Sequence, residues 1–388
     1  MSLPPDIKID NAAVSFGAGV DKAIDAALAD KRLVGAVVLI MQDGKPVYRR
    51  AAGLADREAG RTMTEDTIFR LASVTKPIVT IAAMRLVEQG RMGLDDPITR
   101  WLPDFRPRLA DGGEAVIRLR HLLTHTAGLS YCFIDEDGPY TRAGVSDGIG
   151  EPGMALAENL KRIASAPLRF APGEGWCYSL AIDVLGGVIE QEMAMSLDDA
   201  VAELVTGPLG LTDTAFSVRD RQRLAAAYFN ASPEPERMGQ EAVIPALTGS
   251  VRFAPDRIFD PSSYHSGGAG MAGTADDVLR ILETIRQGGG ALLSTETVAT
   301  MMTDQANGLR QQVEPGSGFG FGWAVVTDPD AAQVPLSRGS LQWGGVYGHS
   351  WFVDPTRKLT VVALTNTTLE GMWGRFTVDL KQAIYAAL

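Results

Sequence analysis

The segment "SVTKPIVTIAAMRLVEQG", residues 73–90, combines an S-x-x-K motif with the strongest helical pattern in the chain. Pro77 fits only near a helix start, where a missing N–H costs little, so we expect the helix to begin close to Ser73. The stretch "PIVTIAAM" is apolar almost throughout. This composition predicts a helix packed between layers of the protein rather than one lying on its surface.

Ser73 and Lys76 lie three positions apart, slightly less than one helical turn, so the lysine amine can reach the serine hydroxyl. A helix start also offers partial positive charge and unpaired N–H groups where an oxyanion would form. Burial favours the neutral amine that a base requires. Taken alone the motif is weak, because an exposed helix start with a solvated lysine would explain it equally well. In this buried context it favours an activated serine nucleophile.

A second motif competes for the same role. The segment "GVSDG", residues 144–148, has the G-x-S-x-G form of a nucleophile elbow around Ser146. Such an elbow needs a hydrophobic strand entering the serine and a helix leaving it. The flanking segments "DEDGPYTRAG" and "IGEPGM" are polar and rich in turn residues, which predicts a loop. An α/β-hydrolase esterase that uses Ser146 remains the alternative.

Composition excludes several classes of function. The 388 residues are 45% hydrophobic and 21% charged, as in ordinary globular proteins, and the net charge of -11 argues against a nucleic-acid partner. The N-terminal segment "MSLPPDIKIDNAAVSF" has no basic lead-in to an apolar core, and no apolar run reaches the roughly 18 residues that span a bilayer. We therefore expect a cytoplasmic, soluble protein without membrane contact. Cys132 and Cys177 are too few for a disulfide framework, and we expect both to be packing residues.

The order of patterns along the chain predicts its architecture. Residues 18–32 have helical spacing, and two β-rich runs flank Asp43-Gly44 as in a hairpin. Helical patterns dominate the middle, strands return after residue 315, and residues 373–388 form a last amphipathic helix. We expect an α/β fold of the α+β type, with an antiparallel sheet closed by both termini and flanked by helices. The predicted sheet domain comprises residues 1–72 and 306–388, the mostly helical domain comprises residues 73–305, and the active site lies in the cleft between them.

The four histidines do not predict a metal site. His121 and His125 are four positions apart, like two zinc ligands on one helical face, but no adjacent Glu base and no third ligand is in view. We expect neither metal nor cofactor. His265 and His349 could serve a triad with Ser146 by chain order alone. That interpretation would leave the S-x-x-K segment without a role.

Several motifs occur in the order found in one superfamily. They are "SVTK", "LLTHTAGL" (122–129), "APGEGWCYS" (171–179), "PLGLTDTAF" (208–216), "GGAGMAGTADDVLR" (267–280), "GFGFGW" (318–323) and "WGGVYGHSWFVDP" (343–355). Over residues 30–385 the chain resembles the serine β-lactamase-like superfamily, and most of all the family VIII carboxylesterases. The resemblance implies the class C β-lactamase architecture, with the site in the cleft, and makes the "LLTHTAGL" segment a structural turn.

The resemblance also implies roles for individual residues. Ser73 would be the acylated nucleophile, Lys76 its proton partner and Tyr178 the phenolic member. Which of Lys76 and Tyr178 takes the proton is left open. A tyrosine close to cationic groups ionises more readily and can share the role of base.

The third motif would lie on a C-terminal strand beside the site. It corresponds to Trp343, Gly344 and Gly345, and the glycines would let the strand approach the substrate closely. The resemblance implies an oxyanion hole built from the backbone N–H groups of Ser73 and Val346. Trp343 itself would form part of the pocket wall.

Two positions depart from the β-lactamase pattern. Leu180 stands where those enzymes typically have Asn, and Trp343 stands where they have Lys. Without these polar partners the pocket favours neutral acyl groups. We therefore expect a carboxylesterase that hydrolyses short-chain acyl esters of small molecules through a serine acyl-enzyme. A β-lactamase, cephalosporin deacetylase or D-peptidase on the same fold, and a catalytically silent binding module, remain alternatives.

Overall fold

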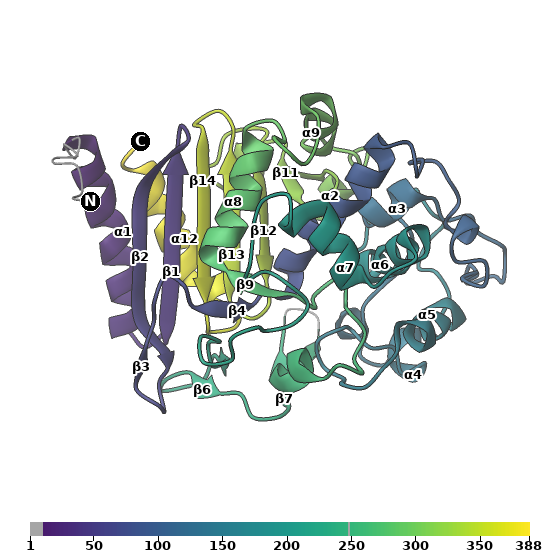
Figure 1. Ribbon diagram of the computed structural model, residues 1–388, viewed down its shortest axis with the longest axis horizontal. Helices are drawn as coiled ribbons and strands as arrows, with labels where there is room; N and C mark the ends of the chain where they lie inside the picture. Colours follow the sequence, from purple (N-terminus) through teal and green to yellow (C-terminus); the bar gives the residue numbers. More distant parts are fainter. Residues whose placement is uncertain (1–10, 247–248) are drawn as a thin grey trace.

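The computed structural model describes residues 11–246 and 249–388 and is built around one antiparallel sheet of eight strands (Figure 1). The strand order is β10-β11-β12-β13-β14-β1-β2-β3. β1 pairs with β14, with Ala36 opposite Thr365, so the N-terminal hairpin lies beside the last strands of the chain. The sheet is closed by both termini, as predicted. Its strands are β1 (Gly35–Gln42), β2 (Lys45–Asp56), β3 (Arg61–Thr62), β10 (Ser317–Phe319), β11 (Ala324–Val326), β12 (Leu341–Gly345), β13 (His349–Asp354) and β14 (Leu359–Thr365).

Helices cover both faces of this sheet because β1 is apolar on both faces. Successive side chains of a strand point to opposite sides. Ala36, Val38 and Ile40 pack with helices α1 (Asn11–Ala29) and α12 (Arg375–Tyr385). Val37 and Leu39 belong to the main core on the other face, where α8 (Ala275–Arg286) packs against β1 and β14 (Figure 1).

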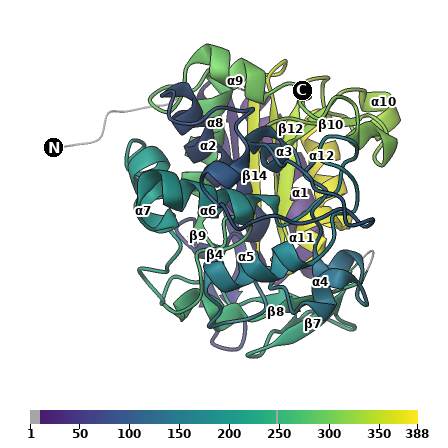
Figure 2. The same cartoon turned by 90° about the vertical axis from the view of Figure 1, so that its right-hand side faces the viewer.

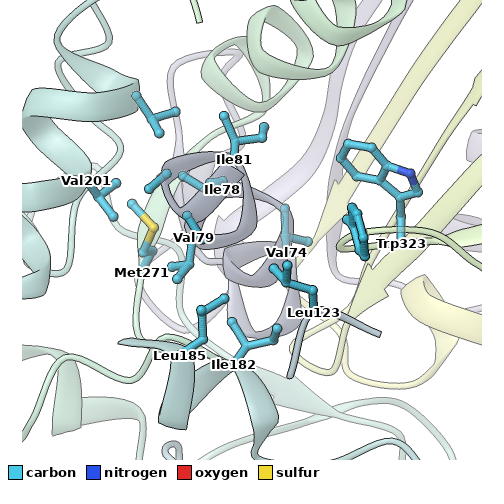
Figure 3. Close-up of a cluster of buried hydrophobic side chains, with 14 of the residues drawn as sticks. Val74, Ile78, Val79, Ile81, Leu123, Ile182, Leu185, Val201, Met271 and Trp323 are labelled. Carbon is cyan, nitrogen blue, oxygen red and sulfur yellow. The ribbon is translucent and has the colours of Figure 1, made fainter. Parts of the chain in front are cut away.

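Helix α2 (Thr75–Glu88) is surrounded by apolar side chains (Figure 3). Its Ile78, Val79 and Ile81 are at most 2% exposed. The prediction of a helix packed between layers is therefore confirmed. Figure 3 labels side chains around it from several other segments: Leu123, Ile182, Leu185, Val201, Met271 and Trp323.

The other helices gather mostly on one side of the sheet (Figure 2). They are α3 (Leu119–Leu123), α4 (Pro139–Arg142), α5 (Leu156–Ser165), α6 (Ala181–Met193), α7 (Leu197–Val201), α9 (Thr295–Met301), α10 (Pro329–Ala332) and α11 (Glu370–Trp373). Shorter helical turns are η1 (Ala72–Val74), η2 (Ile98–Arg100), η3 (Cys132–Ile134), η4 (Ala202–Thr206), η5 (Pro255–Phe259) and η6 (Arg310–Gln312). Within the described ranges, no helix is long and apolar enough to cross a membrane.

Short strands missing from the sequence prediction form three further pairs. They are β4 (Ile68–Arg70) with β9 (Ala272–Thr274), β5 (Tyr228–Phe229) with β6 (Glu236–Arg237), and β7 (Ala242–Pro245) with β8 (Ser250–Phe253). Strands this short carry too few residues to show an alternating pattern. Helix α8 falls within the predicted helical part, residues 73–305, but packs against the sheet. The division into two domains at residues 72 and 306 stays a prediction.

Candidate active site

Ser73 lies at a sharp turn between β4 and α2. Leu71 is fixed by its N–H, which donates to the Met271 carbonyl oxygen at 2.8 Å. Ala72 has φ of +45°, a left-handed conformation that is uncommon for residues other than glycine. Local strain of this kind concentrates at functional sites. The turn buries Ala72 and Val74 and leaves the Ser73 side chain partly exposed.

Lys76 is 1% exposed and contacts Ser73, as the motif spacing predicted. Its Nζ lies 3.1 Å from Ser73 Oγ and 2.7 Å from the carbonyl oxygen of Gly268. A carbonyl oxygen only accepts, so the amine donates to Gly268. The same Nζ lies 4.7 Å from the ring centroid of Tyr178 and 5.5 Å from that of Tyr131. The amine is therefore held between a nucleophile, a backbone acceptor and two aromatic faces.

Tyr178 completes the cluster, with its Oη 2.6 Å from Ser73 Oγ. The segment before α6 that carries it is held by His125. The Ser179 N–H donates to His125 Nδ1 at 3.3 Å, and the Cys177 N–H donates to the His125 carbonyl at 3.0 Å. Burial lowers the pKa of His125 well below 6.5, so its neutral ring can accept this bond. The structural role of the "LLTHTAGL" segment therefore agrees with these contacts.

The wall beside Tyr178 is aromatic. The Trp343 ring lies 5.3 Å from that of Tyr178 and 5.4 Å from that of Phe319. The guanidinium of Arg310 lies 4.8 Å from Trp176, 5.5 Å from Phe319 and 5.4 Å from Trp343, measured to the ring centroids. One buried cation thus contacts three aromatic side chains next to the candidate nucleophile.

The end of β12 approaches the turn before Ser73. A Cβ on Gly345 would lie 2.3 Å from the Leu71 carbonyl oxygen, so only glycine permits this contact. At Gly344 a Cβ would lie 2.6 Å from the His349 carbonyl oxygen. The following residue, Val346, packs in a small apolar cluster that includes Ala72. The oxyanion hole formed by the N–H groups of Ser73 and Val346 stays a prediction, and this packing supports it.

Leu180 differs from its expected role. It is 0% exposed and belongs to the main hydrophobic core, directly before α6. A side chain without exposed surface lines no pocket. In this structure Leu180 is a packing residue, while Trp343 is the partly exposed member of the pair.

Ser146 lies in a loop, as the turn-rich flanking sequence predicted. It is 1% exposed, and its backbone N–H and carbonyl are bound by Asn159 at 2.8 and 3.0 Å. Its Oγ accepts from the Gly148 N–H at 3.3 Å. In the described part of the chain no hydrogen bond joins Ser146 to a histidine. The serine of the G-x-S-x-G motif stabilises a loop.

His121 and His349 hydrogen-bond to the backbone, His265 packs against the ring of Phe216, and the two cysteines are partly buried free thiols. His349 Nε2 donates to the Arg70 carbonyl at 2.8 Å, and His121 Nδ1 accepts from the Arg118 N–H at 3.2 Å. Over residues 11–246 and 249–388, no three His, Cys, Asp or Glu side chains are grouped as a metal site would require. Cys132 and Cys177 are unbridged, and burial raises the pKa of both thiols. Neither is an activated thiol.

Several residues of the site escaped the sequence analysis. Tyr131 and Arg310 carry no local signal, because only the folded chain brings them to Lys76 and Trp343. Gly268 lies within the motif at residues 267–280, whose sequence alone does not indicate a contact with Lys76. Asp183 sits five positions after Tyr178, on the first turn of α6. Its burial could not be read from the sequence.

Ser73 lies at a helix start beside an antiparallel sheet and is hydrogen-bonded to a lysine and a tyrosine. This arrangement is typical of the S-x-x-K class of serine hydrolases. A model of the Beta-lactamase family matches residues 20–378, and the chain belongs to that family.

Individual relatives are similar over nearly the whole chain. Esterase EstB of Burkholderia gladioli is 53% identical over 378 residues, which cover 96% of each chain. Lovastatin esterase of Penicillium rubens is 27% identical over 396 residues, covering 94% of this chain and 96% of that protein. The solved structure of EstCE1, described as a hydrolase with promiscuous acyltransferase activity, has a TM-score of 0.92 and 45% identity, covering 97% of this chain and 100% of that one. The resemblance to family VIII carboxylesterases and the class C β-lactamase-like fold are confirmed.

Proposed function

We propose that the protein is a carboxylesterase that hydrolyses short-chain acyl esters of small molecules through an acyl-enzyme on Ser73. One observation carries this proposal. Ser73 Oγ is hydrogen-bonded at once to Tyr178 Oη at 2.6 Å and to Lys76 Nζ at 3.1 Å. A serine hydroxyl is a weak nucleophile, and a base within hydrogen-bond reach is what activates it.

The reaction has two steps. Ser73 Oγ attacks the ester carbonyl, its proton passes to the Lys76–Tyr178 pair, and the pair then protonates the departing alcohol. Water attacks the acyl-enzyme, gives a proton to the same pair, and Ser73 regains its hydrogen. The backbone N–H groups of Ser73 and Val346 stabilise the oxyanion in both steps.

The pocket favours neutral acyl groups. Trp343, rather than a lysine, stands beside Tyr178, and the Arg310 guanidinium behind it is only 5% exposed. A pocket of this kind offers apolar contact and no exposed cation for a lactam carboxylate. The assignment as an esterase agrees with the similarity to Esterase EstB and to EstCE1. A cytoplasmic location without macromolecular partners belongs to the same proposal.

Parallel assays with p-nitrophenyl butyrate and a chromogenic cephalosporin test this function. We expect kcat/KM for the ester to exceed that for the lactam by at least tenfold, with both activities lost in Ser73→Ala. The Ser146→Ala variant is the matched control and should retain ester hydrolysis. Efficient lactam turnover with weak ester hydrolysis would assign a β-lactamase instead.

A further inference from the structure

A cavity of about 240 Å³ is lined by two segments, residues 216–221 after η4 and residues 257–270 before β9. It is distinct from the candidate active site, because Lys76, Tyr178 and Trp343 do not line it. Pockets for drug-sized ligands measure roughly 300–1,000 Å³, so this cavity suits a smaller molecule. Its basic and aromatic lining residues are Phe216, Arg221, Arg257, Phe259, Tyr264 and His265.

The two segments are held together by backbone pairing next to the cavity. The Ala215 N–H donates to the Ala272 carbonyl oxygen at 3.1 Å, and the Ala272 N–H donates to the Ala215 carbonyl oxygen at 2.8 Å. Ile258 and Phe259 pack against a small apolar cluster that includes Ala272. The cavity walls are therefore fixed by hydrogen bonds and by apolar packing.

Arg257 is a buried cation in the wall of this cavity, and it is 7% exposed. Its Nε donates to the Glu151 carbonyl oxygen at 3.3 Å and its Nη2 to the Tyr264 carbonyl oxygen at 2.8 Å, whereas its Nη1 has no hydrogen-bond partner among the described residues. Asp183 is close enough to feel its charge but forms no ion pair with it, and the Asp183 carboxylate accepts from Ser266. Buried charges are normally paired, so Arg257 has the capacity to bind an anion.

Arg221 supplies a second cation at the same cavity. Its side chain is exposed, and its guanidinium lies 4.0 Å from the ring centroid of Phe259. Within the described chain this guanidinium forms no hydrogen bond and no ion pair. Stacking on a ring leaves the N–H groups at the guanidinium edge free, and that edge matches a carboxylate through two parallel hydrogen bonds. Arg221 therefore offers an unused pair of donors.

Asp260 is the acidic residue that lines the cavity, and its oxygens already have donors. Its Oδ1 accepts from Ser262 Oγ at 2.6 Å and from the Ser262 N–H at 2.9 Å, and its Oδ2 accepts from Ser263 Oγ at 2.9 Å. The bonds from Ser262, followed by that from Ser263, hold the pKa of Asp260 below its ordinary value. Arg221 and Arg257 thus outnumber one carboxylate that neutral donors stabilise, which leaves a positive excess for a monoanion.

The rest of the wall offers aromatic faces. The rings of Phe216 and His265 lie 5.2 Å apart, and the ring centroid of Tyr264 lies 4.8 Å from the Arg257 guanidinium. Together with Phe259 these rings provide apolar contact for the body of a ligand. A molecule with one carboxylate on a small apolar body matches both the charge and the surface of the cavity.

We propose that this cavity is a second binding site, for a small organic carboxylate whose charge is held by Arg221 and Arg257 and whose apolar body packs against Phe216 and Phe259. The choice of ligand rests on the proposed esterase function, because ester hydrolysis releases carboxylic acids. The cavity takes acids of the same chemical class as the products of the reaction at Ser73.

An occupant of this site contacts the segment that positions the candidate nucleophile. Gly270 lines the cavity. Two residues earlier, the Gly268 carbonyl oxygen accepts from Lys76 Nζ at 2.7 Å. One residue later, the Met271 carbonyl oxygen accepts from the Leu71 N–H at 2.8 Å, directly before the turn at Ser73. The second site and the catalytic lysine thus share one stretch of backbone.

Titration calorimetry with benzoate tests the site. The protein is first labelled with a serine-directed phosphonate, so that Ser73 and the space beside it are occupied. We expect benzoate to bind the labelled protein with a Kd of about 1 mM or below. Benzyl alcohol keeps the ring but lacks the charge, and inorganic phosphate has the charge but no apolar body. Each should bind roughly tenfold more weakly than benzoate.

Two substitutions locate the binding. Arg221→Met and Arg257→Met keep the apolar stems and remove the charges, and we expect benzoate affinity to fall by roughly fivefold and tenfold, respectively. The matched control is Arg252→Met, which changes an exposed arginine on β8 that does not line this cavity. The control should keep the Kd of wild type. If Arg257→Met does not fold, the exposed Arg221 decides the question alone.

The inference is overturned if benzoate does not bind the labelled protein, if Arg221→Met leaves its affinity unchanged, or if phosphate binds as tightly as benzoate. These results are separate from the test of the esterase. Absence of a phosphonate adduct on Ser73 refutes the esterase proposal, and the arginine variants then locate benzoate in unlabelled protein. A normal adduct without benzoate binding refutes only the second site.

Discussion

Tyr178 Oη lies 2.6 Å from Ser73 Oγ, although the two residues are 105 positions apart in the chain. Helical spacing alone brings Lys76 to Ser73, but the tyrosine reaches the serine only through the fold. The turn at His125 fixes the segment that carries Tyr178, and α6 begins three residues after it. Hydrogen-bond reach is the first requirement for a general base, and Tyr178 meets it.

We predict that Tyr178→Phe lowers kcat for p-nitrophenyl butyrate by roughly 10²- to 10⁴-fold, the usual contribution of a positioned acid–base group. KM should change little, because the ring and its contact with Trp343 remain. Steady-state kinetics, with circular dichroism as a folding control, measure this. A variant that retains full kcat would remove the tyrosine from the base role.

Arg310 should control the shape of the acyl pocket. Its guanidinium packs against Trp343 and two other aromatic rings, its Nε and Nη1 have no partner among the described residues, and Glu314 is its ion-pair partner. Arg310→Met keeps the apolar stem but removes a cation–π contact worth about 2 kcal/mol when desolvated. We expect KM for the butyrate ester to rise several-fold with a smaller change in kcat.

The matched control for this prediction is Arg162→Met. This substitution disrupts the ion pair of Arg162 with Glu158 on α5, and both of these side chains are more exposed than Arg310. It should leave KM unchanged, since exposed pairs contribute little. Equal kinetic effects of the two substitutions would contradict a specific role of Arg310 in the pocket.

His349 should make the fold sensitive to mild acid. Burial lowers its pKa to about 4, from 6.5 in the unfolded chain. Between these values the unfolded state binds more protons than the folded state. Stability is therefore complete above pH 6.5 and falls as the pH drops toward 4. From pH 7 to pH 5 the loss assigned to this one residue is about 2 kcal/mol.

Urea unfolding of wild type and His349→Gln at pH 7 and pH 5 measures this loss. The variant is expected to be less stable at pH 7, because the donor to the Arg70 carbonyl is changed. Its stability should nevertheless decline less between the two pH values. The same decline in both proteins would show that His349 is not the acid-sensitive group.

The sheet, the central helix and the Ser73–Lys76 contact could be predicted because each follows from local patterns. Two β-rich runs flank Asp43-Gly44, and Pro77 lies in the first turn of α2. Tyr178 and the Trp343 motif came from the resemblance, since the pattern around Tyr178 is equally typical of core packing. The contacts of Arg310 and Asp183 depend on long-range packing, which no local pattern encodes.

Leu180 shows why a position in a motif is not enough. The sequence places it two residues after Tyr178, where a polar side chain would face the substrate in related enzymes. In this chain the residue is apolar, and burial in the core is favoured over exposure in a cleft. Its side chain therefore packs inward at the start of α6, whereas Trp343 stays partly exposed beside Tyr178.

The claim that Ser73 is the nucleophile is tested most directly by finding the residue to which a serine-directed phosphonate attaches. The protein is labelled, digested and mapped by mass spectrometry in wild type, Ser73→Ala and Ser146→Ala, with p-nitrophenyl butyrate hydrolysis measured in parallel. We predict one adduct on the peptide that contains Ser73 in wild type and Ser146→Ala, and neither adduct nor activity in Ser73→Ala. An adduct on the peptide that contains Ser146, with activity kept in Ser73→Ala and lost in Ser146→Ala, would contradict the account.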